Sequence, residues 1–372
     1  MKQFLWGLLI GFIIVGSTGN ITSQEADQLP LNVFIGYDFA ASEDVARLNE
    51  MIVSLQGRLG AAFQAENLVV SFTNDEEIAD LHINLDLADN QATLYIDLAA
   101  VDPFPPALPS PYLMPHLHSG LPLSGSPDNP RLEEVTVEII VAIGAYIRGD
   151  CATTTEQLSS VLPTIDTVAV FIEQLTAYLN FYLANCALID EDYEIAGELY
   201  QTNLDIYNVN NFADRYRVEA SVNLAWIYFE ELGDATTALA LLDFPILTHT
   251  EWLGVYPLAM RAYIYAMQAN HDAAFAEVEA AINLMPGDPS PYVLSGQIYL
   301  LFQEWDNALG DFDWVDKNFG DYPDTYFYRG MTLHELGEDA DAVADFATYL
   351  EMAPHGFHAE EAQEYINTIG GN

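Results

Sequence analysis

The sequence predicts an α+β protein in which a small α/β module precedes an all-α solenoid of helix pairs. Two patterns predict this fold. Short β-rich runs alternate with one helical segment in residues 31–98, and small and aromatic residues recur every 34 residues towards the C-terminus. Hydrophobic residues make up 51% of the 372 residues, which is enough for sizeable cores in two or three domains.

The N-terminus has the features of an export signal. Lys2 precedes an apolar run at residues 4–16, and small and polar residues follow it. The run is shorter than the roughly 20 residues that a membrane-spanning helix prefers. Residues 1–24 are therefore predicted to be a signal peptide or, if residues 4–19 stay uncleaved, a membrane anchor. Either alternative predicts an extracytoplasmic protein, secreted or anchored to the membrane by its N-terminus.

Residues 25–102 form the predicted α/β module. The expected order is strand, helix, strand, strand and strand, at residues 31–39, 41–64, 68–72, 81–87 and 92–98. The helical segment has apolar residues at helical spacing, and Asp89-Asn90 is expected to be the turn of a hairpin. If this module senses a ligand or catalyses a reaction, Asp38, Asp86 and Asp97 near the strand ends would supply its polar groups.

A proline-rich segment, residues 103–130, follows the module and holds nine of the eighteen prolines. It cannot be helical, because proline lacks the backbone N–H and clashes with the preceding turn. It is predicted to be an extended strap packed on its neighbours or a mobile linker, and its apolar content favours the strap. Residues 131–148 then form the helix that leads into the solenoid.

The 34-residue period is carried by positions with distinct chemistry. Three small residues, Ala262, Gly296 and Gly330, allow a first helix to approach its partner closely. A second small set lies on the second helix, and larger apolar side chains fill the remaining space; these are Ala274, Ala308 and Ala342, with Val278, Phe312 and Phe346. The turns between the helices contain Asn270 and Gly337, which suit a left-handed backbone.

This pattern resembles the tetratricopeptide repeat, a helix–turn–helix unit of 34 residues. Three regular units are expected at residues 255–288, 289–322 and 323–356, with a cap helix in residues 357–372. Less regular units extend the array upstream, which gives five to six helix pairs over residues 131–356. The unit around Ala225 and Ala238 has one extra residue before its turn. The resemblance implies a right-handed superhelix whose concave groove binds a protein or peptide.

The outward side of each first helix would line that groove. Its aromatic and other apolar side chains are suitable anchors for a peptide. Packing between neighbouring helices is the alternative role for each of them. The predicted groove residues are Phe181, Val222, Trp226, Phe229, Tyr263, Met267, Leu301, Met331 and His334.

The sequence contains no recognisable catalytic or cofactor motif. It lacks a glycine-rich phosphate loop, a nucleophile elbow and the usual zinc-binding patterns. Two histidine pairs, His116 with His118 and His355 with His358, are more typical of exposed histidines than of a metal site. The chain is therefore predicted to be non-enzymatic, with no cofactor and no metal, unless an activity resides in the α/β module.

The chain is strongly acidic. It has 56 Asp and Glu residues against 10 Lys and Arg, a formal net charge of −46. Such a surface repels phosphate backbones, so nucleic acid is a poor candidate partner. The charge either attracts basic proteins or serves solubility over every face of the molecule.

Cys151 and Cys186 are the only cysteines in the chain. In an exported protein a single pair predicts a disulfide. It would close a loop of about 35 residues and contribute about 3–4 kcal/mol in the chain-entropy account. Two buried thiols are the alternative.

Overall fold

The computed structural model describes residues 31–37, 45–66, 70–73, 81–88, 91–98, 121–126, 128–147, 150–167, 172–210, 215–248, 254–320, 322–354 and 358–370. The chain divides into two compact units, one with the described residues up to 210 and one with those from 215 onward. The predicted signal peptide or anchor and residues 101–120 of the predicted strap lie outside the described residues. None of the described helices is both long and apolar enough to cross a membrane.

The first unit contains a five-stranded sheet. Its strands are β1 (Leu31–Tyr37), β2 (Val70–Thr73), β3 (Leu81–Ala88), β4 (Gln91–Leu98) and β5 (Leu121–Gly125), in the order β2-β1-β3-β4-β5. β1 pairs in parallel with β2 and β3, whereas β4 runs antiparallel to both β3 and β5. Ala88 pairs with Gln91, so the predicted hairpin is present.

Strand β5 comes from the segment predicted to be a proline-rich strap. It lies at one edge of the sheet, where Pro122 pairs with Tyr95 of β4. An edge strand tolerates a residue without a backbone N–H, because one of its sides has no neighbouring strand. This part of the segment therefore extends the sheet.

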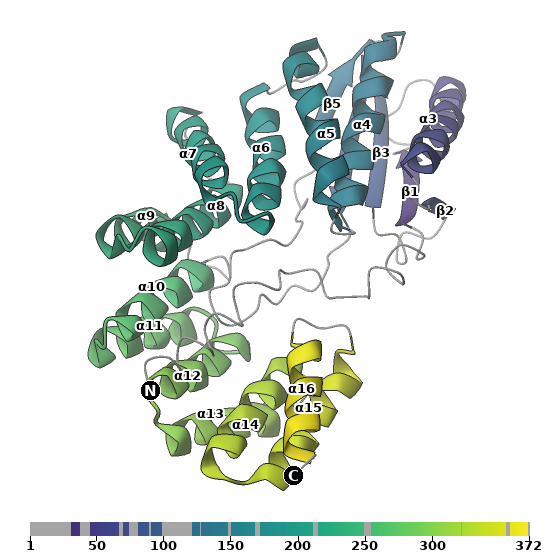
Figure 1. Cartoon of the computed structure of the whole chain (residues 1–372). Helices are drawn as coiled ribbons and strands as arrows, with labels where there is room; N and C mark the ends of the chain where they lie inside the picture. The colour runs from purple at the N-terminus through teal and green to yellow at the C-terminus, as the bar shows by residue number, and fades with distance from the viewer. Residues whose placement is uncertain are drawn as a thin grey trace. The chain divides into compact units, whose positions relative to one another are not determined.

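Helices α3 (Val45–Ala65) and α4 (Pro130–Ile147) pack on one face of this sheet (Figure 1). α3 buries Leu48, Leu55, Leu59 and Phe63, which lie on one side of the helix because they are spaced by about one or two turns. Alternate residues of β3 and β4 are buried beneath the helices. The core of the module lies between these two layers.

The first unit continues with α5 (Cys151–Val161), the 3-10 helix η2 (Leu162–Thr167), α6 (Ile172–Ile189) and α7 (Tyr193–Asn210). Cys151 and Cys186 form a disulfide, as the sequence predicts, with their Cα atoms 5.2 Å apart. Beside it, the buried Asn185 side chain donates to Tyr146 Oη at 2.9 Å and accepts from Tyr200 Oη. The disulfide and this amide link α4, α5, α6 and α7.

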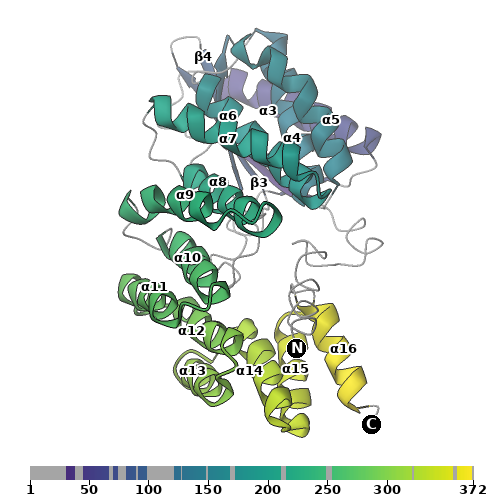
Figure 2. The ribbon, with the colours of Figure 1, turned by 60° about the vertical axis from the view of Figure 1, so that its left-hand side comes forward.

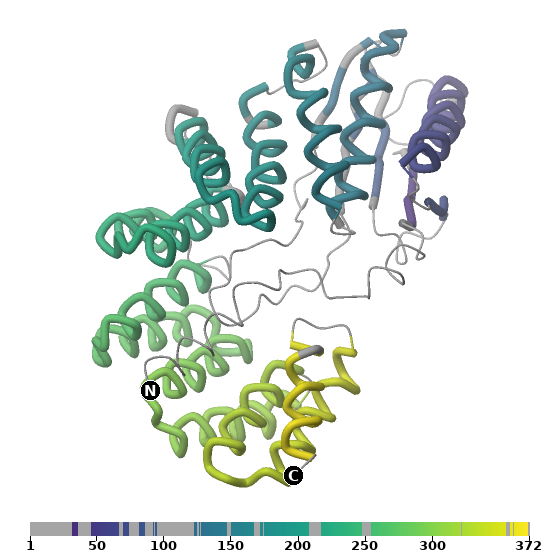
Figure 3. Tube along the Cα trace, in the orientation of Figure 1, coloured from purple at the N-terminus to yellow at the C-terminus, as the bar shows by residue number. Residues whose placement is uncertain are grey.

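The second unit consists of helix pairs followed by one closing helix (Figures 1 and 3). The pairs are α8 (Arg215–Trp226) with α9 (Ala235–Thr248), α10 (Val255–Met267) with α11 (His271–Leu284), α12 (Ser290–Leu301) with α13 (Trp305–Asn318), and α14 (Pro323–Leu336) with α15 (Asp339–Met352). The closing helix is α16 (Ala359–Gly370). The last three pairs fall within the three regular units that the 34-residue period predicts.

The turn inside each regular pair is left-handed at the same position of the repeat. The φ angle is 57° at Ala269, 61° at Gln303 and 80° at Gly337, and these residues are 34 apart. The expectation for Gly337 is therefore confirmed. Asn270 has a different role, because its side chain caps α11 by accepting from the backbone N–H of Ala273 at 3.3 Å. The position in the repeat, more than the residue type, determines this turn.

The small residues of the period permit the close helix approach that the sequence predicts. A Cβ atom added at Gly296 would lie 2.5 Å from Cε1 of Phe312, and one added at Gly330 would lie 3.0 Å from Cε1 of Phe346. Both rings are fully buried. The glycines therefore make room for the aromatic ring of the second helix.

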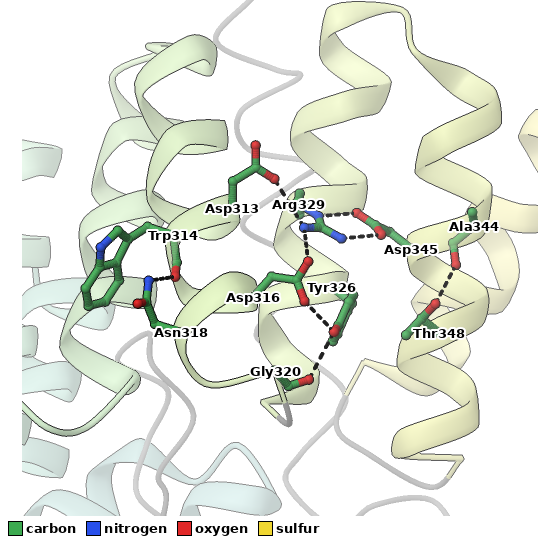
Figure 4. Close-up of polar contacts among 10 residues, drawn as sticks. All are labelled: Asp313, Trp314, Asp316, Asn318, Gly320, Tyr326, Arg329, Ala344, Asp345 and Thr348. Carbon is green, nitrogen blue, oxygen red and sulfur yellow. Dashed lines mark hydrogen bonds and ion pairs between the residues drawn. The ribbon is translucent and has the colours of Figure 1, made fainter.

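An ionic contact also follows the period (Figure 4). Arg329 on α14 makes two hydrogen bonds to Asp345 on α15, at 2.7 and 2.9 Å, and its Nη1 donates to Asp316 on α13 at 2.7 Å. Tyr326 Oη donates to Asp316 at 2.6 Å. Burial alone would raise the pKa of Asp316, but the hydrogen bonds from Tyr326 and Arg329 and the arginine charge outweigh it, so this pKa is lowered.

The same position two periods upstream holds Arg261, whose Nη2 lies 2.7 Å from Glu277 Oε2. The middle unit has Ser295 there, opposite Asp311. Ser295 hydrogen-bonds to Asp311, but burial still raises the pKa of this carboxyl. Asp311 Oδ2 is buried and has no hydrogen-bond partner among the described residues. The middle unit therefore buries a carboxylate without the arginine that its neighbours have.

Replacing Gly296 by alanine should lower the free energy of unfolding of the second unit by about 1–3 kcal/mol, because the new methyl group overlaps the buried Phe312 ring. Gly310→Ala is the matched control, since a Cβ there meets no atom within 4 Å. It should stabilise helix α13 by about 0.5–1 kcal/mol. Urea unfolding followed by circular dichroism checks both. Equal responses of the two variants would contradict the close approach.

Asp311→Asn should stabilise the second unit at pH 7, on the order of 1 kcal/mol, because it removes a poorly solvated charge. The folded-state pKa of Asp311 is raised, so the gain should disappear as the pH falls below the unfolded pKa of about 3.9. Asp345→Asn is the contrasting variant and should cost about 2 kcal/mol at pH 7, because Arg329 loses a charged partner. Destabilisation by both at pH 7 would contradict this account.

Candidate partner-binding site

The first helices of the pairs form one side of the second unit. α10 contacts both α8 and α12, and α12 contacts α14, so the first helices are neighbours of one another. Figure 2 shows them along the inner side of an arc, with α9, α11 and α13 along its outer side. This inner face is where the sequence predicts a groove.

Four of the nine predicted groove residues are buried and are corrected here. Val222, Trp226 and Tyr263 are 3%, 4% and 5% exposed, so they pack within the layer of first helices. Phe181 is fully buried in the first unit, where its ring lies 6.0 Å from that of Tyr200. Their side chains support the inner face and do not present a contact surface, because neighbouring helices lie close enough to cover them.

The other predicted groove residues are at least partly accessible. Met267 is 41% exposed at the end of α10, and Phe229 is half-buried near the end of the α8 segment. Leu301 and Met331 are partly buried against the hydrophobic cores of their units. His334 Nδ1 lies 2.7 Å from Asp339 Oδ1, and its ring touches that of Tyr365 at 5.9 Å. The structure thus brings Phe229, Tyr263 and Met267 to adjoining first helices.

The extra residue in the α8 unit produces a π-helix. Ala225 and Ala238 are 13 residues apart, whereas the equivalent alanines are 12 apart in the next three units. Residues Ile227–Glu231 absorb the extra residue as the π-helical turn η3 at the end of α8. Such turns are frequent at functional sites, because they re-aim the side chains that follow.

Glu230 in this turn is linked to α10. Tyr263 Oη donates to Glu230 Oε1 at 2.7 Å, and the Phe229 and Tyr263 rings meet edge to face at 5.9 Å. Burial raises the pKa of Glu230; the hydrogen bond from Tyr263 opposes this shift, and the neighbouring charge of Glu231 adds to it. Burial, together with the charge of Glu230, raises the pKa of Tyr263, so its hydroxyl stays a donor.

The residues Phe229, Glu230, Tyr263 and Met267 are called the Glu230 cluster below. It combines a desolvated carboxylate with two aromatic rings and an exposed thioether. A carboxylate in such surroundings can accept an N–H donor from a partner more strongly than an exposed one. The sequence analysis missed Glu230, although the extra residue before the turn was the feature that located it.

The structure favours no metal site in the region described. No group of three or more His, Cys, Asp and Glu side chains suited to a metal occurs among the described residues. His358, from one of the predicted pairs, is buried; its ring stacks on Phe327 at 3.9 Å and its Nε2 lies 3.0 Å from Tyr328 Oη. His116, His118 and His355 lie outside the described residues.

Comparison with known proteins identifies the fold. A tetratricopeptide repeat protein from Parabacteroides merdae is 18% identical in sequence, and the similarity covers 66% of this chain and 87% of that one with a TM-score of 0.51. The chain has the tetratricopeptide repeat fold. A thermophilic protein of the same repeat class from Thermus thermophilus is 20% identical over 54% of this chain and all of that one, but its TM-score of 0.42 carries no weight.

Neither a family model nor a curated protein matches the chain. At 18% identity the similarity to the Parabacteroides protein extends to the fold alone. The tetratricopeptide repeat resemblance inferred from the 34-residue period is therefore confirmed as a fold, and a partner has to be argued from the side chains of this chain.

Tyr263→Phe should raise the pKa of Glu230 further, because the lost hydrogen bond favours the ionised carboxylate. Carboxyl chemical shifts followed by NMR across a pH titration measure this change. Tyr265→Phe on the same helix is the control and should leave the Glu230 titration in place. A fall in the Glu230 pKa in the Tyr263 variant would show that the two side chains are not coupled as described.

Proposed function

We propose that this chain is a scaffold that binds a protein or peptide through the inner face of its helix pairs. The Glu230 cluster is the observation that carries the proposal. Its exposed Met267 and half-buried Phe229 offer apolar contacts beside a carboxylate that accepts hydrogen bonds. Amphipathic anchors of this kind suit an extended or helical peptide.

The partner of the Glu230 cluster is proposed to be basic. The formal charge of −46 draws positively charged segments towards the chain and repels nucleic acid. A Lys or Arg side chain would place its N–H groups on Glu230 while its aliphatic stem covers Met267. Glu230 is two residues from Leu232, which is 64% exposed and adds apolar surface.

The scaffold is proposed to act outside the cytoplasm and without catalysis. The apolar run at residues 4–16 supports export, and the Cys151–Cys186 disulfide fits an oxidising compartment. Contact with a membrane would then be confined to residues 4–19, if they stay attached. The proposal includes no cofactor.

The alternative, a ligand-sensing or enzymatic α/β module, has no support from the comparisons. Of its proposed polar groups, Asp38 lies outside the described residues. Asp86 and Asp97 belong to the paired strands β3 and β4, at positions opposite Thr93 and His82. We therefore place the function of the chain on the helical repeats.

Selection of a displayed random-peptide library on the full chain tests this function. Enriched peptides should carry Lys or Arg beside apolar residues. The double variant Phe229→Ala, Met267→Ala should weaken them at least roughly tenfold, because each buried apolar contact contributes about 1 kcal/mol or more. Leu247→Ala is the matched control: this residue is 81% exposed on α9, an outer helix. Peptides that bind both variants equally well would place the site elsewhere.

A further inference from the structure

A cavity of about 330 Å³ lies between α3, α4 and the sheet of the first unit. Its floor is apolar and is formed by Leu55, Leu85, Leu94 and Leu132, each of which is at most 3% exposed. The volume falls at the lower end of the range of about 300–1,000 Å³ that is usual for small-molecule sites. The cavity is separate from the Glu230 cluster, which belongs to the second unit.

Two arginine–carboxylate bridges cross the cavity from α3 to the start of α4. Arg47 Nη2 is 2.5 Å from Asp128 Oδ1, and Arg58 Nε is 3.1 Å from Glu133 Oε2. These four side chains line the cavity together with Glu50. Both arginines are already engaged by carboxylates, whereas the acids outnumber them three to two.

Glu133 provides the unsatisfied group of this cavity. Its Oε2 pairs with Arg58, but its Oε1 is buried and has no hydrogen-bond partner among the described residues. A buried acceptor without a donor costs free energy, of the order of 1–3 kcal/mol. Glu133 lies in the first turn of α4, where the helix end favours negative charge, so the group that is lacking is an N–H donor.

We infer that this cavity binds a small organic cation, a primary amine on a short aliphatic chain. The ammonium group donates to Glu133 Oε1 and the methylene groups lie on the leucine floor. The negative charge of the whole chain raises the local concentration of cations and lowers that of anions. An anionic ligand would have to displace Asp128 or Glu133 from an arginine and would leave Glu133 Oε1 unpaired.

Calorimetric titration of the full chain at about 0.15 M salt tests the inference with three five-carbon probes. These are 1,5-diaminopentane, pentane-1,5-diol and glutarate, which share a chain length and differ in charge. The diamine should bind with a stoichiometry of one, and the diol and glutarate should not bind measurably. Glu133→Gln should weaken the diamine roughly tenfold, because it replaces a charged hydrogen bond by a neutral one.

Two further variants complete the experiment. Ser54→Phe fills the cavity from its exposed α3 wall without changing charge, and it should abolish binding even if Glu133→Gln fails to fold. Glu279→Gln removes an equivalent exposed acid from α11 in the second unit and should leave binding unchanged. Thermal unfolding of each variant monitors the fold.

Three outcomes would overturn the inference. Absence of saturable diamine binding removes the site. Binding of glutarate in place of the diamine assigns the cavity to the arginines. Equal weakening by Glu133→Gln and Glu279→Gln reduces the effect to general attraction of cations by an acidic chain.

Discussion

The contact between a small residue on the first helix and a bulky residue on the second is the constraint on which the helix pairs depend. Gly296 and Gly330 lie against Phe312 and Phe346, so close that an added methyl group would overlap the ring. Where the small residue is Ala262, the equivalent bulky position is Val278, and both are buried in one cluster. The side-chain volumes compensate one another, and the spacing of the two helices is kept from unit to unit.

This spacing decides where a partner can bind. Because each second helix is held against its own first helix, the first helices are left as neighbours along the inner face. Trp226 and Tyr263 lie between such neighbours and are buried. Accessible side chains occur only where the packing is interrupted, and in the α8 unit the π-helical turn interrupts it. The irregular unit is therefore a better candidate for recognition than the regular ones.

The sequence predicts the helix pairs well because their period is written in sterically constrained positions. It predicts the helix, strands and hairpin of the module from local spacing, but it misses β5, since a short stretch with Pro122 has no strand pattern of its own and gains one only by pairing with β4. It also misplaces the groove. Phe181, Val222, Trp226 and Tyr263 are on the predicted helix faces, but whether a face is covered depends on neighbouring helices far along the chain.

The scarcity of basic residues gives each of them structural weight. Arg329 joins α13, α14 and α15, Arg261 pairs with Glu277 on α11, and Arg47 and Arg58 connect α3 with the start of α4. With 56 acids and 10 bases in the chain, most carboxylates cannot have a cation of their own. Asp311, Glu230 and Glu133 are the acids whose positions are partly buried as well. A mostly exposed acid is satisfied by water, whereas a partly buried one gains from a donor supplied by another molecule. Excess charge alone therefore leaves the chain unselective, and it is burial at particular carboxylates that makes cation recognition local.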